Sequence, residues 1–348
     1  MCQNRLVWGI LLLMLLAGSA QAGNEMYLTV KEATSMAEEN SLELHLTYLA
    51  LKEAQLQYKQ AEAAMIMRPS PVMLLQAQAG LDMAQQNYLM GKDKLGLTVK
   101  TDFYSVLKME NMVAIAAEAV ESAKRHLDIA EKKLAVGTVT RLDVIQATRS
   151  VLNAQAGLSQ AQHGLELSQM KFRQTLGVPL DGLVYAQSYE LDYQPFDGDL
   201  YADLAFALTN RDEIKQLQIA IDVARKNVEL ADNDYTPALT LEQASINLAK
   251  METQFNQVRA LLELDVRQNY SAIKDAVERI RVLQKGVEEA EEMIRLSELM
   301  YEANMITSTD LADARLAVLS AKNDYIAATY DYQLAKAKYD TAVALALR

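Results

Sequence analysis

Hydrophobic positions near the C-terminus of this chain follow a seven-residue repeat. Alanine recurs at positions 314, 321, 328, 335 and 342, and a large residue recurs at the same spacing, as Leu311, Val318, Tyr325, Tyr332 and Tyr339. A shorter copy of the pattern begins at Val144 and Ala147. A sustained heptad predicts helices that supercoil against a partner helix, and small residues on alternate turns allow the helix axes to approach closely.

A turn signal precedes each heptad copy. Gly137 and Asn304 are the residue types that most readily take the left-handed conformation ending a helix. Three residues after each turn comes a threonine, followed by an acid in the Thr-x-x-acid pattern of a capping box. The capping residues and their acids are Thr140, Asp143, Thr307 and Asp310.

Breaks elsewhere in the chain divide it into two similar halves. The prolines within 69–71 and at 237 predict helix ends, because proline cannot continue a helix. Gly91 and Gly96 predict local loosening of a long helix. Thr29 is the expected first cap. The predicted helices cover residues 28–67, 72–134, 140–176, 200–208, 213–233 and 241–301, and a last helix runs from 309 almost to 348. A short strand is predicted at 189–193.

These elements predict an all-α fold made of duplicated, long, antiparallel helical hairpins. We assign residues 1–22 to a signal peptide, 23–176 to a first helical repeat, 177–208 to a connector and 209–348 to a second repeat. The longest helices would reach roughly 90 Å. A curved layer of such helices leaves apolar edges, so we expect it to close by symmetric association of several copies.

Composition and charge narrow the function classes. The formal net charge of −12 argues against nucleic-acid binding. The first 22 residues combine Arg5, a short apolar run and an Ala20-Gln-Ala22 cleavage site, which predicts export to the cell envelope, either the outer membrane or the periplasm. The single cysteine, Cys2, lies in this leader. No catalytic constellation, cofactor motif or metal-ligand cluster is present in the sequence, so we predict that the protein is not an enzyme.

The duplicated turns and heptads resemble the TolC-type outer-membrane efflux protein family. The Leu-Gly-Val-Pro-Leu connector at 176–180 and the Asn-x-x-Glu opening of each half share this resemblance, which covers nearly all of the chain after the leader. The resemblance implies a homotrimer whose helices form an α-helical barrel, an exit duct for exported substrates. It also implies two further partners, an inner-membrane transporter and a periplasmic adaptor (membrane fusion protein).

The chain departs from the family pattern at one place in each half. Family members insert β-strands where this chain has residues 68–72 and 235–241, and neither segment has the alternating run of about 10 residues that a barrel strand needs. We therefore expect the β-barrel strands to be absent. This departure keeps an alternative open, namely a structural coiled-coil scaffold of the cell envelope with no transport activity.

Matching the family motifs gives candidate functional residues. The resemblance implies a tunnel constriction at Asp310, Asp313, Asp143 and Gln146, where three protomers would bring carboxylates into one ring. It implies an adaptor-contact tip at Val136, Gly137, Thr138, Ala303, Asn304, Met305 and Ile306. A simpler interpretation makes Asp310 a capping acid, Asp313 a solvated helix residue and the tip residues only turns.

Overall fold

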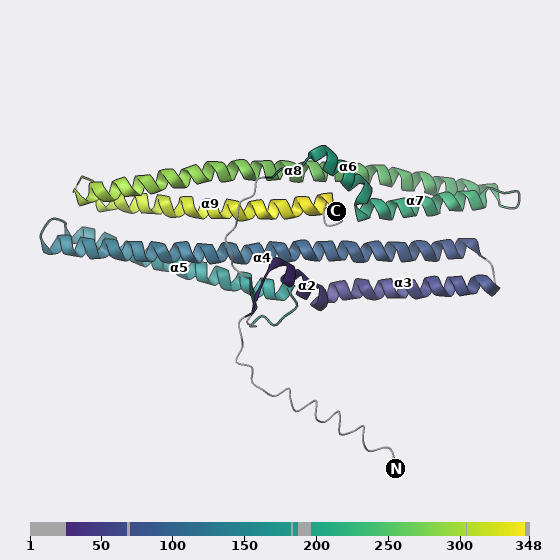
Figure 1. The fold of residues 1–348 in the computed structure, drawn as a ribbon, viewed down its shortest axis with the longest axis horizontal. Coiled ribbons are helices and arrows are strands. Elements are labelled where there is room, and N and C mark those ends of the chain that lie inside the picture. Colours follow the sequence, from purple (N-terminus) through teal and green to yellow (C-terminus); the bar gives the residue numbers. More distant parts are fainter. Residues whose placement is uncertain (1–25, 68–69, 182–183, 187–195, 304, 345–348) are drawn as a thin grey trace, which may run out of the picture.

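The computed structural model describes residues 26–67, 70–181, 184–186, 196–303 and 305–344, which form two rows of long helices (Figure 1). The first half of the chain makes one row and the second half makes the other. In chain order the elements are β1 (Met26–Leu28), α2 (Val30–Asn40), α3 (Leu42–Met67), α4 (Pro71–Ala135), α5 (Arg141–Thr175), β2 (Val184–Ala186), α6 (Leu200–Asn210), α7 (Asp212–Ala231), α8 (Ala238–Glu302) and α9 (Ser308–Val343).

The rows are two copies of one unit built on a very long helix. α4 and α8 have 65 residues each, so each is roughly 100 Å long at about 1.5 Å per residue. α3 and α5 pack antiparallel on α4, and α7 and α9 pack in the same way on α8 (Figure 1). The predicted duplicated hairpins are confirmed, and a constant offset of 167 residues, the separation of Pro71 and Ala238, relates them.

Contacts between the rows make a single layer. α4 packs against α9 over one half of its length and against α7 over the other half. The helices therefore follow the order α5, α4, α9, α8 at the end that carries the two predicted turns. At the opposite end the order is α3, α4, α7, α8. The edges of the layer are α5 and α3 on one side and α8 on the other.

The prediction of a single helix over residues 28–67 is wrong, because the chain breaks at Ser41. Ser41 has an extended backbone (φ −68°, ψ 114°), and its hydroxyl accepts a hydrogen bond from the N–H of Leu44 at 3.2 Å. The side chain of Asn40 donates to the carbonyl of Leu176 at 3.0 Å. A contact distant in sequence therefore ends α2, and Ser41 starts α3.

The predicted loosening at Gly91 and Gly96 is also wrong, since α4 is continuous through both residues. A Cβ built at Gly91 would lie 3.6 Å from the side chain of Leu44. Each glycine costs a helix only about 1 kcal/mol. The packing of α2 and α3 against this part of α4 stabilises the helix.

A small parallel sheet ties the start of the described chain to the connector. Met26, Tyr27 and Leu28 of β1 pair with Val184, Tyr185 and Ala186 of β2. The rings of Tyr27 and Tyr185 stack at 5.5 Å between centroids. This sheet was not predicted, and the predicted strand at 189–193 lies outside the described residues, as does the predicted leader.

Each copy has its own apolar core at the middle of the layer. Phe103 and Phe172 pack edge to face in the first core, with ring centroids 5.9 Å apart. Phe196 packs in the same manner on Tyr339 in the second core, at 5.2 Å. Tyr339 is the counterpart of Phe172 at the 167-residue offset, and its hydroxyl donates to the buried Asp203 at 2.7 Å.

The remaining helix ends differ from the predicted ends by a few residues. α6 continues to Asn210, and α9 is described as far as Val343. The helix resumes at Pro71 in the first copy and at Ala238 in the second, directly after the predicted stops. Within the described part of the chain, none of the helices combines the length and the apolar character needed to cross a bilayer.

Candidate functional site

The first tip, residues 136–140, ends α4 on a left-handed glycine. Gly137 has φ 78°. Its N–H donates to the carbonyl of Leu134 at 2.9 Å, and the N–H of Thr138 donates to the carbonyl of Lys133 at 3.0 Å. This pair of bonds is a Schellman motif, which satisfies carbonyls that the end of the helix would leave without partners.

The second tip, residues 303–307, ends α8 in the same register. The N–H of Met305 donates to the carbonyl of Met300 at 2.8 Å, the same five-residue step as Thr138 to Lys133. The N–H of Ala303 donates to the carbonyl of Leu299 at 3.1 Å. Ile306 is half-buried, and Asn304 lies outside the described residues. The two tips lie at the same end of the molecule (Figure 1).

A capping box starts the helix that follows each tip. In the first copy the carboxylate of Asp143 accepts from the backbone N–H of Thr140 at 2.8 Å and from its hydroxyl at 2.7 Å. In the second copy Asp310 accepts from the N–H of Thr307 at 2.9 Å and from its hydroxyl at 2.7 Å. Hydrogen bonds to the threonine therefore lower the pKa of both carboxyls, led by the side chain of Thr140 at Asp143 and by the backbone of Thr307 at Asp310.

Ser308 joins the two tips within one chain. This residue is the first of α9 and is only 4 % exposed. Its hydroxyl lies 3.0 Å from Oδ1 of Asp143 and 3.2 Å from Oε1 of Gln146. Two of the four predicted constriction residues are thus brought together by a residue of the second copy. Sequence reasoning did not identify Ser308, whose role depends on how the two rows dock.

Asp310 and Asp313 are placed differently. They lie one turn apart at the start of α9, and both are exposed. Among the described residues of this chain, Asp313 forms no ion pair, and the carboxylate of Asp310 accepts hydrogen bonds only from its own capping threonine. These two carboxylates are therefore available to a group outside the protomer.

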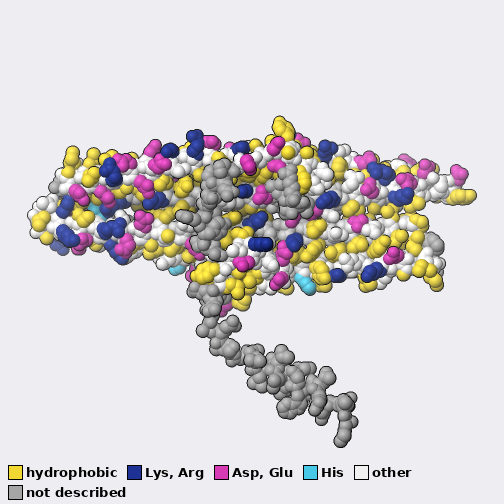
Figure 2. All heavy atoms as spheres, viewed as in Figure 1, with side chains coloured by type: hydrophobic (Ala, Val, Ile, Leu, Met, Phe, Trp, Pro, Cys, Tyr) yellow, Lys and Arg dark blue, Asp and Glu magenta, His cyan; other side chains and the backbone are white. Residues whose placement is uncertain are grey.

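Apolar side chains are exposed on both tips. Val136 is 74 % exposed and Met305 is 73 % exposed. Leu142, the second residue of α5, is also exposed. Hydrophobic side chains appear at this end of the molecule among charged ones (Figure 2). Exposed apolar residues at a rigid turn are suited to contact another protein.

The sequence analysis missed a partly buried cluster behind the tips, formed by His126, Lys133 and Tyr301. Lys133 lies 3.9 Å above the ring centre of Tyr301 and donates to its carbonyl at 2.8 Å. The ring of His126 lies 5.3 Å from that of Tyr301. Burial lowers the pKa of His126 from 6.5 to about 4, and the cations Arg315 and Lys133 add to this effect. His126 and Lys133 are seven residues apart on α4, which was the available signal.

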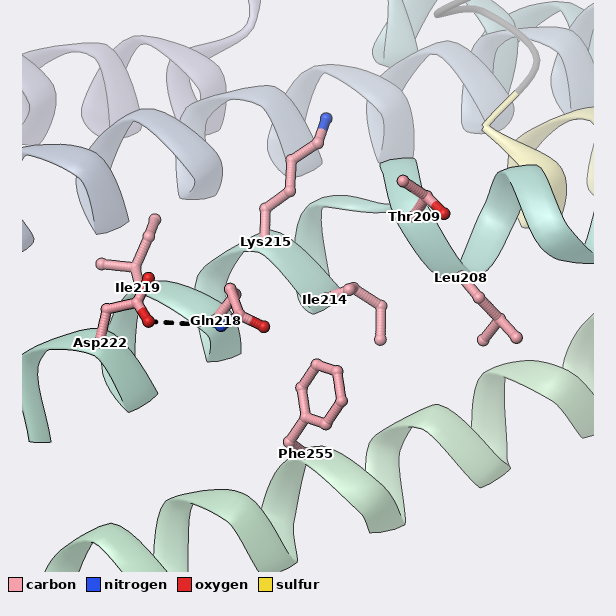
Figure 3. Close-up of a pocket in the computed structure, with 8 residues that line it drawn as sticks. All are labelled: Leu208, Thr209, Ile214, Lys215, Gln218, Ile219, Asp222 and Phe255. Atoms are coloured by element: carbon pink, nitrogen blue, oxygen red, sulfur yellow. Dashed lines mark hydrogen bonds between the residues drawn. The ribbon is translucent and has the colours of Figure 1, made fainter. Parts of the chain in front are cut away.

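A shallow groove of about 420 Å³ lies between α6, α7 and α8, away from the tips. Figure 3 shows Ile214 and Phe255 facing one another across it. Its only drawn hydrogen bond joins Gln218 to Asp222 within α7, at 3.4 Å. Ligand sites usually have several convergent polar groups, and this groove has an open, mostly apolar wall.

A comparison of the sequence with models of known protein families assigns this chain to one family. The model of the outer membrane efflux protein family matches residues 72–178 and 240–344, which is more than half of the chain and covers one hairpin of each copy. The chain therefore belongs to the outer membrane efflux protein family. Members of this family are efflux channels rather than enzymes.

Individual relatives are distant in sequence. The alkaline protease secretion protein AprF of Pseudomonas aeruginosa is 22 % identical in an alignment of 301 residues, and the match covers 74 % of this chain and 62 % of AprF. The match thus spans less than two thirds of the length of that relative.

Solved structures share the fold. The outer membrane protein VceC of Vibrio cholerae has a TM-score of 0.73 at 14 % identity, covering 90 % of this chain and 95 % of VceC. The CmeC outer membrane channel of Campylobacter jejuni has a TM-score of 0.72 at 12 % identity, covering 94 % of this chain and 90 % of CmeC. The protomer fold is that of these helical channel proteins.

Proposed function

We propose that three copies of this chain form an α-helical exit duct of a tripartite export system in the cell envelope. The observation that carries this proposal is the open helical layer, whose edges α5 and α8 expose apolar side chains. On α5 these include Leu142, Ile145, Leu152 and Leu167, and on α8 they include Val282, Met293, Leu296 and Leu299. Association of copies edge to edge buries these side chains, and a closed ring leaves no edge exposed.

Assembly is the first test. We expect the chain without residues 1–22 to sediment as a trimer at micromolar concentration in analytical ultracentrifugation. A monodisperse monomer would contradict the duct and favour the alternative, a structural coiled-coil scaffold without transport activity.

In this proposal the two tips dock on a periplasmic adaptor, which connects the duct to an inner-membrane transporter. Val136 and Met305 support it, because they present apolar side chains at the end of the layer. A photo-reactive amino acid at position 136 or 305 should form an adduct with an envelope protein in cells, identifiable by mass spectrometry. The matched control is Tyr235, which is 97 % exposed in the turn at the opposite end. Equal adducts from position 235 would contradict tip docking.

We also propose that Asp310 and Asp313 lie at the narrow end of the duct, where carboxylates of three protomers gather and attract cations. Asp143 and Gln146 then contribute indirectly, because Ser308 already holds them within the protomer. Asp313→Asn should leave the trimer mass unchanged and reduce block of conductance by divalent cations. Unchanged block in trimers of the variant would place Asp313 away from the constriction.

A further inference from the structure

The two helical repeats have the same backbone arrangement, yet they bury side chains at different equivalent positions. We define the inner seam as the contact that α4 and the start of α5 make with α9 inside one protomer. Ile115 of α4 is 8 % exposed in this seam, whereas its counterpart Val282 of α8 is 62 % exposed. His126 is 3 % exposed, whereas its counterpart Met293 is 55 % exposed. The side of α8 that corresponds to the seam side of α4 is thus uncovered.

The same relation holds for the other partner in the seam. Ser308 is buried at the start of α9, and its counterpart Arg141 is exposed at the start of α5. The uncovered sides of α8 and α5 are the two edges of the layer. A second copy placed with its α5 edge against α8 would therefore repeat the inner seam.

The charges of the residues next to the tips are consistent with a second copy repeating the inner seam. In the inner seam, Ser308 contacts Asp143 and Gln146. At the 167-residue offset these three residues become Arg141, Asp310 and Asp313. The repeated contact thus sets an exposed guanidinium against two exposed carboxylates, and none of these three residues has an ion-pair partner among the described residues of its own chain.

We propose that Arg141 of one protomer binds Asp310 and Asp313 of the next protomer, and that this ion pair closes each seam between subunits at the tip. Two carboxylates against one guanidinium leave one negative charge for each protomer, so the proposed constriction still attracts cations. The proposal rests on the trimeric duct proposed above. Arginine suits the position because its planar guanidinium carries five donors and can bind two carboxylates together. Oδ2 of Asp310 is held by Thr307, which leaves Oδ1 for the incoming guanidinium.

This assignment gives the tip two kinds of seam. The inner seams are held by the hydroxyl of Ser308, a neutral donor. The seams between protomers are held by opposite charges near the surface, which salt screens over about 10 Å at 0.1 M ionic strength. Raised salt should therefore loosen the tip at the boundaries between subunits and leave the inner seams unchanged.

Thiol crosslinking tests the pairing directly. In a full-length Cys2→Ser background, Arg141→Cys with Asp313→Cys and a short bis-thiol reagent should produce covalent dimers and trimers on denaturing gels. The matched control is Ser308→Cys with Gln146→Cys, the equivalent inner-seam pair, which should crosslink within one chain and stay at monomer mass. Absence of the ladder in protein that sediments as a trimer, with the control pair crosslinked, would overturn the pairing alone. Wild-type protein that sediments as a monomer would overturn the trimeric duct itself.

Charge reversal provides a second readout. Arg141→Glu should weaken trimer association on the order of tenfold, because three acids then meet at each seam between subunits. The double variant Arg141→Glu with Asp313→Arg restores opposite charges and should recover most of that loss. Arg149→Glu, an exposed reversal two turns further along α5, controls for net charge. An equal loss in Arg149→Glu, or no recovery in the double variant, would overturn the pairing.

Discussion

The two copies of the hairpin have the same design and different surroundings. α4 and α8 have the same length, and both are followed by a capping box with the same hydrogen bonds. Yet the first copy buries His126 at a position where the second copy exposes Met293. The difference shows that residues diverge between the copies where one of them packs within the chain and the other lies on an edge.

A second divergence lies at the far ends of α5 and α9. Gly177 (φ 69°) and Ala344 (φ 57°) occupy equivalent positions and share the left-handed conformation. A Cβ at Gly177 would lie 2.7 Å from Cβ of Asn40, the residue that ends α2. At position 177 both the left-handed backbone and the nearby Asn40 therefore favour glycine. At position 344 the chain has alanine in spite of the strain of the left-handed backbone.

Exchanging these two residues should give the largest effect, with opposite signs. Gly177→Ala should lower the free energy of unfolding by about 2–4 kcal/mol, because the left-handed strain adds to the overlap with Asn40. Ala344→Gly should raise it by about 0.5–1 kcal/mol through relief of strain. Urea unfolding followed by circular dichroism, at one fixed protein concentration, measures both.

Gly137→Ala is the control for this exchange. Gly137 is also left-handed, but nothing lies within 4 Å of a Cβ built there. Only the backbone strain applies, about 1–2 kcal/mol. A loss at Gly177 no larger than the loss at Gly137 would mean that Asn40 moves away without cost.

Replacing His126 by methionine, the residue at the equivalent position 293, should remove part of the pH dependence of the free energy of unfolding. Burial lowers the pKa of His126 from 6.5 to about 4, so the folded state disfavours its charged form. The contribution of neutral His126 to the free energy of unfolding is therefore complete above pH 6.5 and is lost as the pH falls toward 4. At pH 5 the loss relative to pH 7 is about 2 kcal/mol. His126→Met should reduce the acid-induced loss of stability by this amount.

Unfolding measured at pH 7 and pH 5 tests this effect, with His163→Met as the control because His163 is exposed on α5. The same pH dependence in wild type and His126→Met would show that other groups cause it.

The elements that the sequence predicted are those fixed by local interactions. The capping boxes at Thr140 and Thr307 join residues three positions apart, and the heptad spacing follows from helix geometry alone. Proline at position 71 fits the first helical position. Duplication strengthened these local signals, because each appeared twice in the same order. The predicted fold class and hairpin order were therefore right.

The features that sequence analysis missed depend on contacts between distant segments. The break at Ser41 is stabilised by Asn40 bonding to Leu176, 136 residues away. The pairing of β1 with β2 joins segments on opposite sides of the first hairpin. The role of Ser308 appears only when α9 lies against α4 and α5. Nothing in the local sequence around these residues shows which partner they meet.

We expect the smallest change in the free energy of unfolding from Ser308→Ala, a substitution that makes the two tips alike. Ser308→Ala removes the hydroxyl that contacts Asp143 and Gln146, so the first tip keeps only its capping box, as the second tip does. We expect a loss of about 1 kcal/mol in the free energy of unfolding, the net contribution of such a hydrogen bond. The matched control is Thr309→Ala, whose hydroxyl makes one long contact with Gln146, at 3.5 Å.

The carboxyl pKa values give the sharper measurement of this change. Thr140 is the main cause of the lowered pKa of Asp143, and Ser308 adds to it, so Ser308→Ala should raise that pKa part of the way back. The pKa of Asp310 depends on Thr307 and should stay unchanged. Because the pKa of Asp143 is lowered by folding, its stabilisation is present at neutral pH and is lost as the pH falls through the folded-state value; the variant should lose less stability over that acid range. Carboxyl titration by NMR on selectively labelled protein resolves both residues, and equal shifts at Asp143 and Asp310 would show a general loosening of the tips instead of the loss of one contact.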